Sequence, residues 1–193
     1  PHAVNVALHG AAAALVFLVS ACVAGFMNFA ATDTSSSAVA NFRAREIVKS
    51  VGSRSWLITD GGADGLLLIA AKDLGHPLRV LNIREDGNET YMRYVASLFD
   101  KPRLKNLSHV GMAPLLHEWF RSDPEIDRKV AMLTMPDFFK AGGATVVPYK
   151  LVFLGEKNVE AVDPGELLRI NREFWKEMLP TLRQARRQGP AAG

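Results

Sequence analysis

The chain opens with a long run of hydrophobic residues and becomes polar only afterwards. Within residues 6–31 the polar side chains are His9, Ser20 and Asn28, and no charged residue precedes Asp33. A soluble helix of this length normally has a polar face, which this run lacks. At a rise of 1.5 Å per residue, about 20 apolar residues cross a hydrocarbon core of roughly 30 Å. The pattern therefore predicts that the run lies in a membrane.

We expect a transmembrane helix over residues 8–29, inside a membrane segment 1–32 that is followed by a soluble α/β domain over residues 33–193. Three alternatives stay open. A cleaved signal peptide normally has a basic residue before its apolar region, and none is present here. Residues 19–22, Val-Ser-Ala-Cys, match a bacterial lipoprotein cleavage box in residue type, although apolar residues continue after it. The third alternative is a helix buried in a soluble core.

Beyond a polar linker, short apolar runs alternate with helical patterns. We predict a helix at 38–51, a strand at 55–59, a helix at 66–74 and a strand at 78–83. The strand–helix–strand part is a βαβ unit, which implies parallel strands and a right-handed crossover. The alternation continues in a looser form and predicts a Rossmann-like layered α/β domain. The further predicted elements are helices at 89–99, 113–121 and 136–141, and strands at 130–134, 145–148 and 151–154.

A long amphipathic helix is expected at the C-terminal end. Asp163 is suited to cap it, Pro164 to its first turn, and Glu166 follows three residues after the cap. Pro180 is expected to kink the helix. Its apolar stripe consists of Leu167, Ile170, Phe174, Met178 and Leu182.

The amino-acid composition argues against several classes of function but does not identify one. The net charge is +3, from 23 basic and 20 acidic residues, with no long block of like charge, so nucleic acid is not an expected partner. A single cysteine cannot form an internal disulfide or a multi-cysteine zinc site. The five histidines show no metal-ligand spacing, and no cofactor motif appears. We therefore predict neither a metal nor a cofactor, and no convincing catalytic group.

The most suggestive segment is the turn at residues 60–65, Asp-Gly-Gly-Ala-Asp-Gly, which follows a predicted strand and precedes a helix. Open α/β sheets place ligands at such carboxyl ends. The turn is neither GxGxxG nor a P-loop, and its two carboxylates would repel a phosphate. The alternative is that glycines make a tight turn and an aspartate caps the helix. The candidate ligand-binding residues are Asp60, Gly61, Gly62, Asp64 and, at another strand end, Asp137, which is also a possible helix cap.

Several segments together resemble a known family. They are Ala-Arg-Glu-Ile at 44–47, Trp-Leu-Ile-Thr-Asp-Gly at 56–61 with Asp64, and Leu-Arg-Val-Leu-Asn-Ile at 78–83. They resemble the C-terminal region of bacterial multi-spanning membrane proteins described as protein O-mannosyltransferase-like, which have a GT-C type membrane core. Further similar segments are Met-Pro-Asp-Phe-Phe at 135–139 and the stretch at 147–155.

In that family a last membrane helix is followed by a soluble extracytoplasmic region. The family's turn reads Asn-Gly-Asp-Asn-Asp-Thr, and this chain echoes it only at Asp60, Gly61 and Asp64. The resemblance places the catalytic acid in an early extracytoplasmic loop, far upstream of the last span. It therefore implies a domain that carries no catalytic residues of its own, within a parent protein that is a glycosyltransferase.

The resemblance implies a non-catalytic extracytoplasmic accessory domain that binds acceptor, glycan or partner beside a bacterial inner membrane. Its partners would be the lipid bilayer and upstream membrane-spanning segments or a membrane complex. Two alternatives stay open. One is a single-span, membrane-anchored protein that binds a nucleotide or small molecule at the turn 60–65. The other is a bitopic interaction or sensor module.

Overall fold

The computed structural model describes residues 37–158, 160 and 162–188, which fold around a five-stranded mixed sheet. The strand order across the sheet is β2-β1-β3-β5-β4. Short strands of three to five residues suffice because helices cover both faces. The strands are β1 (Trp56–Thr59), β2 (Arg79–Asn82), β3 (Val130–Met132), β4 (Thr145–Tyr149) and β5 (Val152–Glu156).

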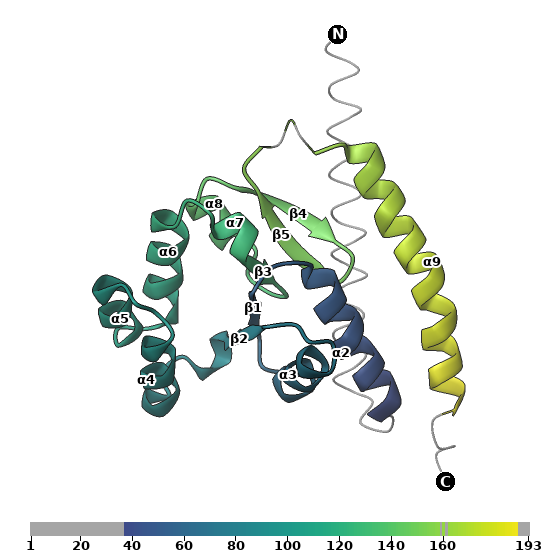
Figure 1. Ribbon diagram of the computed structural model, residues 1–193, viewed down its shortest axis with the longest axis horizontal. Helices are drawn as coiled ribbons and strands as arrows, with labels where there is room; N and C mark the ends of the chain where they lie inside the picture. The colour runs from purple at the N-terminus through teal and green to yellow at the C-terminus, as the bar shows by residue number, and fades with distance from the viewer. Residues whose placement is uncertain (1–36, 159, 161, 189–193) are drawn as a thin grey trace.

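Helices form a layer on each face of the sheet (Figure 1). Helices α4 to α8 contribute to the hydrophobic core on one face, and α2, α3 and α9 contribute to the core on the other. The result is a three-layer α/β/α sandwich. The helices are α2 (Ser37–Val51), α3 (Asp64–Asp73), α4 (Glu89–Ser97), α5 (Pro102–Ser108), α6 (Met112–Ser122), α7 (Ile126–Lys129), α8 (Phe138–Ala141) and α9 (Pro164–Gln188), with a 3-10 turn η1 (Ile83–Glu85).

Strand β1 is an interior strand of the sheet and is buried along its whole length, which explains why its sequence is mostly apolar. Successive side chains of a strand point to opposite faces, so Trp56 and Ile58 enter one core and Leu57 enters the other. The indole ring of Trp56 stacks on Phe99 at 5.5 Å and meets Trp119 edge-on at 4.9 Å. Such aromatic pairs contribute about 0.5–1.5 kcal/mol beyond their buried area. The tryptophan therefore anchors the core beneath α4 and α6.

The predicted βαβ unit is confirmed. Strand β1 pairs in parallel with β2 and also with β3, and helix α3 connects β1 to β2. Because the three parallel strands run in one direction, their carboxyl ends meet at one edge of the sheet. The segments that follow Thr59, Asn82 and Met132 start from that edge.

The Rossmann-like part of the predicted fold class is wrong, although the α/β class is confirmed. Strand β5 runs antiparallel to both β3 and β4, so the sheet is mixed. Only Lys150 and Leu151 separate β4 from β5, and a parallel pair would need a crossover of a dozen or more residues. Lys150 makes the tight turn with a positive φ of 52°.

The transmembrane helix in the predicted fold class is also corrected. No helix within the described residues is both long enough and apolar enough to cross a membrane. The run 8–29, to which the sequence pattern assigned the span, lies outside those residues. Within the described residues, the fold class becomes an α/β domain on a mixed sheet.

The long C-terminal helix is confirmed as α9. The Asp163 carboxylate accepts a hydrogen bond of 2.8 Å from the Gly165 N–H, as expected for a helix start. Glu166 does not complete a capping box; it pairs instead with Arg169 at 2.6 Å. The helix continues through Pro180. Sequence patterning missed two short helices, α5 and α7.

Candidate functional site

The candidate turn lies where the parallel strands end. Residues 60–63 leave β1 and lead directly into α3, and the end of β2 lies beside them because Thr59 is paired with Asn82. We call this group the carboxyl-edge site. It comprises Thr59, Asp60, Gly61, Asp64, Asn82, Arg84 and Tyr91, together with Arg43 of α2.

Asp64 is held by the last residue of β1. The buried Thr59 hydroxyl, 1% exposed, donates a hydrogen bond of 2.6 Å to Asp64 Oδ1 and accepts one of 3.3 Å from the Gly61 N–H. Burial raises the pKa of Asp64, and the negative charges of Asp60 and Glu85 act in the same direction. The Thr59 hydrogen bond opposes them and lowers that pKa. The carboxylate is therefore fixed in direction while its charge is disfavoured by its surroundings.

Asp60 interacts with two arginines, Arg84 and Arg43. Its Oδ2 is 3.4 Å from Arg84 Nη2, and its side chain remains 32% exposed. Burial lowers the pKa of Arg43, and the negative charge of Asp60 opposes that effect. The carboxylate thus compensates the charge of an arginine that is buried in α2.

Neither aspartate caps helix α3, so the capping alternative is wrong. The N-cap residue is Ala63, and no side chain caps the helix there. Asp64 Oδ1 instead accepts from Thr59, and Asp60 Oδ1 accepts only a long 3.5 Å hydrogen bond from Gly62 within the turn. Asp and Asn are favoured in the first turn mainly for capping and charge. The fold therefore holds two carboxylates at this edge that the helix start does not require for capping.

The end of β2 supplies neutral polar groups beside the carboxylates. The Asn82 N–H donates to the Tyr91 hydroxyl oxygen at 2.7 Å, and Asn82 Oδ1 accepts from the Arg84 N–H at 2.9 Å. Burial is the main cause that raises the pKa of Tyr91, with Asp64 adding to it, so the phenol keeps its proton. The site thus combines carboxylate, amide, hydroxyl and guanidinium groups within a short stretch of sheet edge.

The structure does not join Asp137 to this group. It follows β3 and occupies the N-cap position of α8, but its carboxylate makes no capping bond. The side chain is 79% exposed and pairs with Lys140 at 2.6 Å. Among the described residues, no hydrogen bond or ion pair links Asp137 to Asp60 or Asp64. Of the five predicted site residues, Asp60, Gly61, Gly62 and Asp64 lie together and Asp137 stands apart.

Sequence reasoning missed the residues that surround the turn. Thr59 and Asn82 lie at the ends of two strands that the sequence pattern predicted. Because parallel strands end at the same edge of a sheet, their proximity could have been predicted. Arg43 and Tyr91 lie on helices that pack back over this edge, so only the tertiary fold brings them there. Within the part of the chain that the structure describes, no three His, Cys, Asp or Glu side chains are placed to hold a metal ion.

Comparison with known proteins identifies no relative. No model of a known protein family matches this chain, no curated protein matches it at a significant level, and no solved structure does either. The resemblance to O-mannosyltransferase-like proteins therefore rests on the sequence segments quoted above.

Proposed function

We propose that this chain is a non-catalytic accessory domain of a membrane glycosyltransferase-like protein, working on the extracytoplasmic side of a bacterial inner membrane. It binds a hydroxyl-rich ligand, a glycan or a glycosyl acceptor, at the carboxyl-edge site. The observation that carries the proposal is the pair Asp60 and Asp64, whose carboxylates lie at the carboxyl ends of the parallel strands without capping α3. Open α/β sheets commonly bind their ligands at such an edge. The family resemblance supplies the glycosyltransferase context.

The chemistry of the site favours neutral hydroxyl groups. An ionised carboxylate only accepts hydrogen bonds, and a sugar hydroxyl can donate one to it while accepting another from a neighbouring donor. Arg84 is a donor beside Asp60. The Tyr91 hydroxyl oxygen accepts from the Asn82 N–H, so its own proton is available for donation to a ligand. Adjacent sugar hydroxyls are therefore matched by adjacent acceptors and donors.

The same charges disfavour the nucleotide alternative. At about 4 Å, two like charges repel by about 4 kcal/mol at an effective dielectric constant of 20, and a phosphate would meet both Asp60 and Asp64. The turn also lacks the lysine with which a P-loop compensates phosphate charge. A neutral ligand avoids this repulsion.

The proposal is tested by titrating the ¹⁵N-labelled chain with neutral mono- and disaccharides and, separately, with ATP. We expect saturable amide shifts in residues 59–64 and 82–84 with at least one saccharide and none there with ATP. Asp60→Asn and Asp64→Asn should each weaken saccharide binding about tenfold, because a charge-assisted hydrogen bond contributes about 1.5–3 kcal/mol. Asp137→Asn is the matched control at the same sheet edge and should bind like wild type.

Two outcomes would overturn the proposal. One is preferential, saturable binding of ATP at residues 59–64. The other is the absence of site-localised shifts with every saccharide tried, in a protein whose spectrum shows that it is folded.

A further inference from the structure

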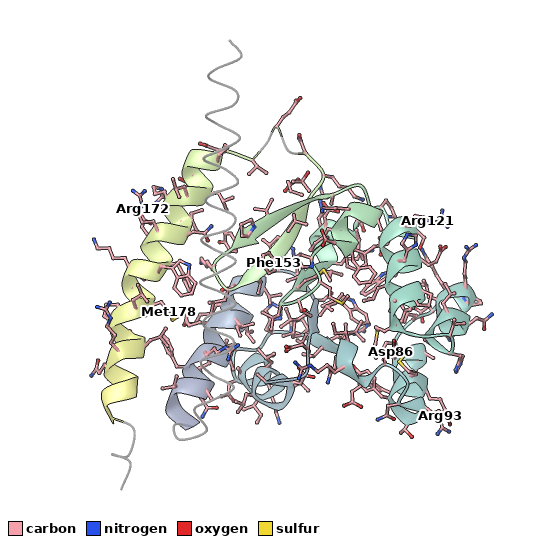
Figure 2. The ribbon with its side chains drawn as sticks, turned by 180° about the vertical axis from the view of Figure 1, so that it is seen from behind. Asp86, Arg93, Arg121, Phe153, Arg172 and Met178 are labelled. Carbon is pink, nitrogen blue, oxygen red and sulfur yellow. The ribbon has the colours of Figure 1, made fainter. Side chains whose placement is uncertain are left out.

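A hollow of about 310 Å³ lies between the start of α4 and the loop that joins α5 to α6. Figure 2 shows two of its residues, Asp86 and Arg93, at the end of the molecule farthest from α9. We call it the α4–α6 hollow. Its principal lining residues are Asp86, Glu89, Met92, Arg93, His109 and Val110.

The fold fixes the shape of the hollow at its rim. Asp86 Oδ1 accepts a hydrogen bond of 2.9 Å from the Met112 N–H, which ties the loop after η1 to the first turn of α6. Gly111, at the same rim, has a φ of +148°, and a Cβ there would come within 3.3 Å of Asp86 Oδ1. The two walls are therefore held together by a contact between segments 26 residues apart.

The walls carry charges of both signs. Asp86 and Glu89 supply carboxylates, whereas Arg93 supplies a guanidinium and His109 an imidazole. Arg93 is oriented on its own helix, because its Nε donates to the Glu89 carbonyl oxygen at 3.3 Å and its Nη2 to Thr90 Oγ1 at 3.5 Å. These are weak bonds to neutral acceptors, so the guanidinium keeps its capacity for an anionic partner.

The hollow also has an apolar part. Met92 is buried beneath it, and Val110 at its mouth is 73% exposed. An isolated valine at that exposure has little contact with protein atoms, and covering it would remove apolar surface from water. At about 310 Å³ the hollow is at the small end of ligand sites, which span roughly 300–1,000 Å³.

We propose that the α4–α6 hollow binds a small zwitterion, an aliphatic α-amino acid. The ammonium group interacts with the carboxylates of Asp86 and Glu89, and the carboxylate with Arg93 and His109. The aliphatic side chain covers Met92 and Val110. A ligand with both charges matches both signs of the walls, whereas a singly charged ligand leaves one sign without a partner. The inference is independent of the carboxyl-edge site.

The probe is L-leucine, titrated into the ¹⁵N-labelled full chain. We expect saturable shifts confined to residues 86–93 and 108–112. N-acetyl-L-leucine lacks the ammonium group and L-leucinamide lacks the carboxylate, so each should bind at least about tenfold more weakly. Glu89→Gln and Arg93→Gln should cause similar losses. Both side chains are exposed, so the variants are expected to fold.

Lys72→Gln on α3 is the control, since it removes an exposed charge elsewhere, and it should bind like wild type. Asp64→Asn should also leave leucine binding unchanged, which separates this inference from the proposed function. No saturable shift up to about 50 mM leucine, or equal binding of leucine and its two neutralised analogues, would overturn the proposal.

Discussion

At the scale of single residues, the adjacent glycines Gly61 and Gly62 of the turn differ in whether the backbone requires glycine. Gly61 has a φ of +89°, a region that side chains of L-amino acids rarely adopt. A Cβ at this position would also lie 2.5 Å from Asn82 Nδ2. Gly62 has no positive φ, and a Cβ there would meet Asp60 Oδ1 at an ordinary 3.7 Å. The turn therefore requires glycine at Gly61, whereas Gly62 could be replaced by alanine without strain.

We predict that Gly61→Ala lowers the free energy of unfolding by about 1–3 kcal/mol, through backbone strain and the clash with Asn82. Gly62→Ala should change it by less than about 0.5 kcal/mol. Urea denaturation of both variants is the measurement. Equal losses in the two variants would show that the geometry around Asn82 is not the constraint we describe.

Residue chemistry was the most predictable part of the site. The sequence places Asp60, Gly61, Gly62 and Asp64 in one turn, and the fold keeps them together. Their partners were less accessible. Nothing in the periodicity of residues 38–51 indicates which way Arg43 faces, since its direction depends on how α2 packs on the sheet.

At the scale of elements, a buried asparagine joins α9 to the β4–β5 hairpin. Asn171 is 4% exposed; its Nδ2 donates to the Pro148 carbonyl oxygen at 3.0 Å, and its Oδ1 accepts from the Lys150 N–H at 2.6 Å. The Lys150 ammonium lies 5.9 Å from the centre of the Phe174 ring, one turn further along α9. The hairpin turn thus sets the position at which α9 packs.

Asn171→Ala should lower the free energy of unfolding by about 1–3 kcal/mol, because it leaves the part-buried Lys150 N–H and the buried Pro148 carbonyl without their partner. Amide hydrogen exchange in α9 should become faster as well. Arg172→Ala, an exposed neighbour on the same helix, is the control and should stay within about 0.5 kcal/mol of wild type. If both variants had the same stability, the hydrogen bonds of Asn171 would not be what holds α9 to the β4–β5 hairpin.

The helices and strands themselves were largely predictable from the sequence, but the direction in which some strands pair was not predicted. Hydrophobic periodicity located each of the strands that the structure describes, since each is a short apolar run. The parallel interpretation failed at β4 and β5, although the short connection at Lys150 already required an antiparallel pair. Helix α5 was missed because its seven residues bury only Leu104 and Ser108, which is too little for a helical stripe to stand out.

At the scale of the whole molecule, two hydrophobic cores support a sheet edge that carries unfavourable charge. The cores lie on opposite faces of the sheet, and together they contain most of the buried apolar side chains of the described residues. At the carboxyl edge, burial raises the pKa of Asp64. A binding residue is commonly kept at some expense of stability, whereas a purely structural residue is not. The sign of the contribution of Asp64 to stability therefore distinguishes binding from structure.

The sign follows from proton linkage. Because the pKa of Asp64 is raised by folding, the folded protein binds more protons than the unfolded chain between the ordinary aspartate value, about 3.9, and the raised value. The contribution of Asp64 to the free energy of unfolding is thus fully retained at a pH below its ordinary pKa. It is lost as the pH rises through the raised pKa of the folded protein. Asparagine keeps an acceptor for the Thr59 hydroxyl and carries no charge, so it avoids this loss.

The binding role of Asp64 is tested most directly by the free energy of unfolding of wild type and Asp64→Asn, measured by urea denaturation between pH 3 and pH 7. We predict that the variant is the more stable protein at pH 7 and that the difference shrinks toward zero as the pH falls below about 4. A variant that is less stable than wild type at pH 7 would mean that the Asp64 carboxylate supports the fold, and it would contradict the assignment of the carboxyl edge as a binding site.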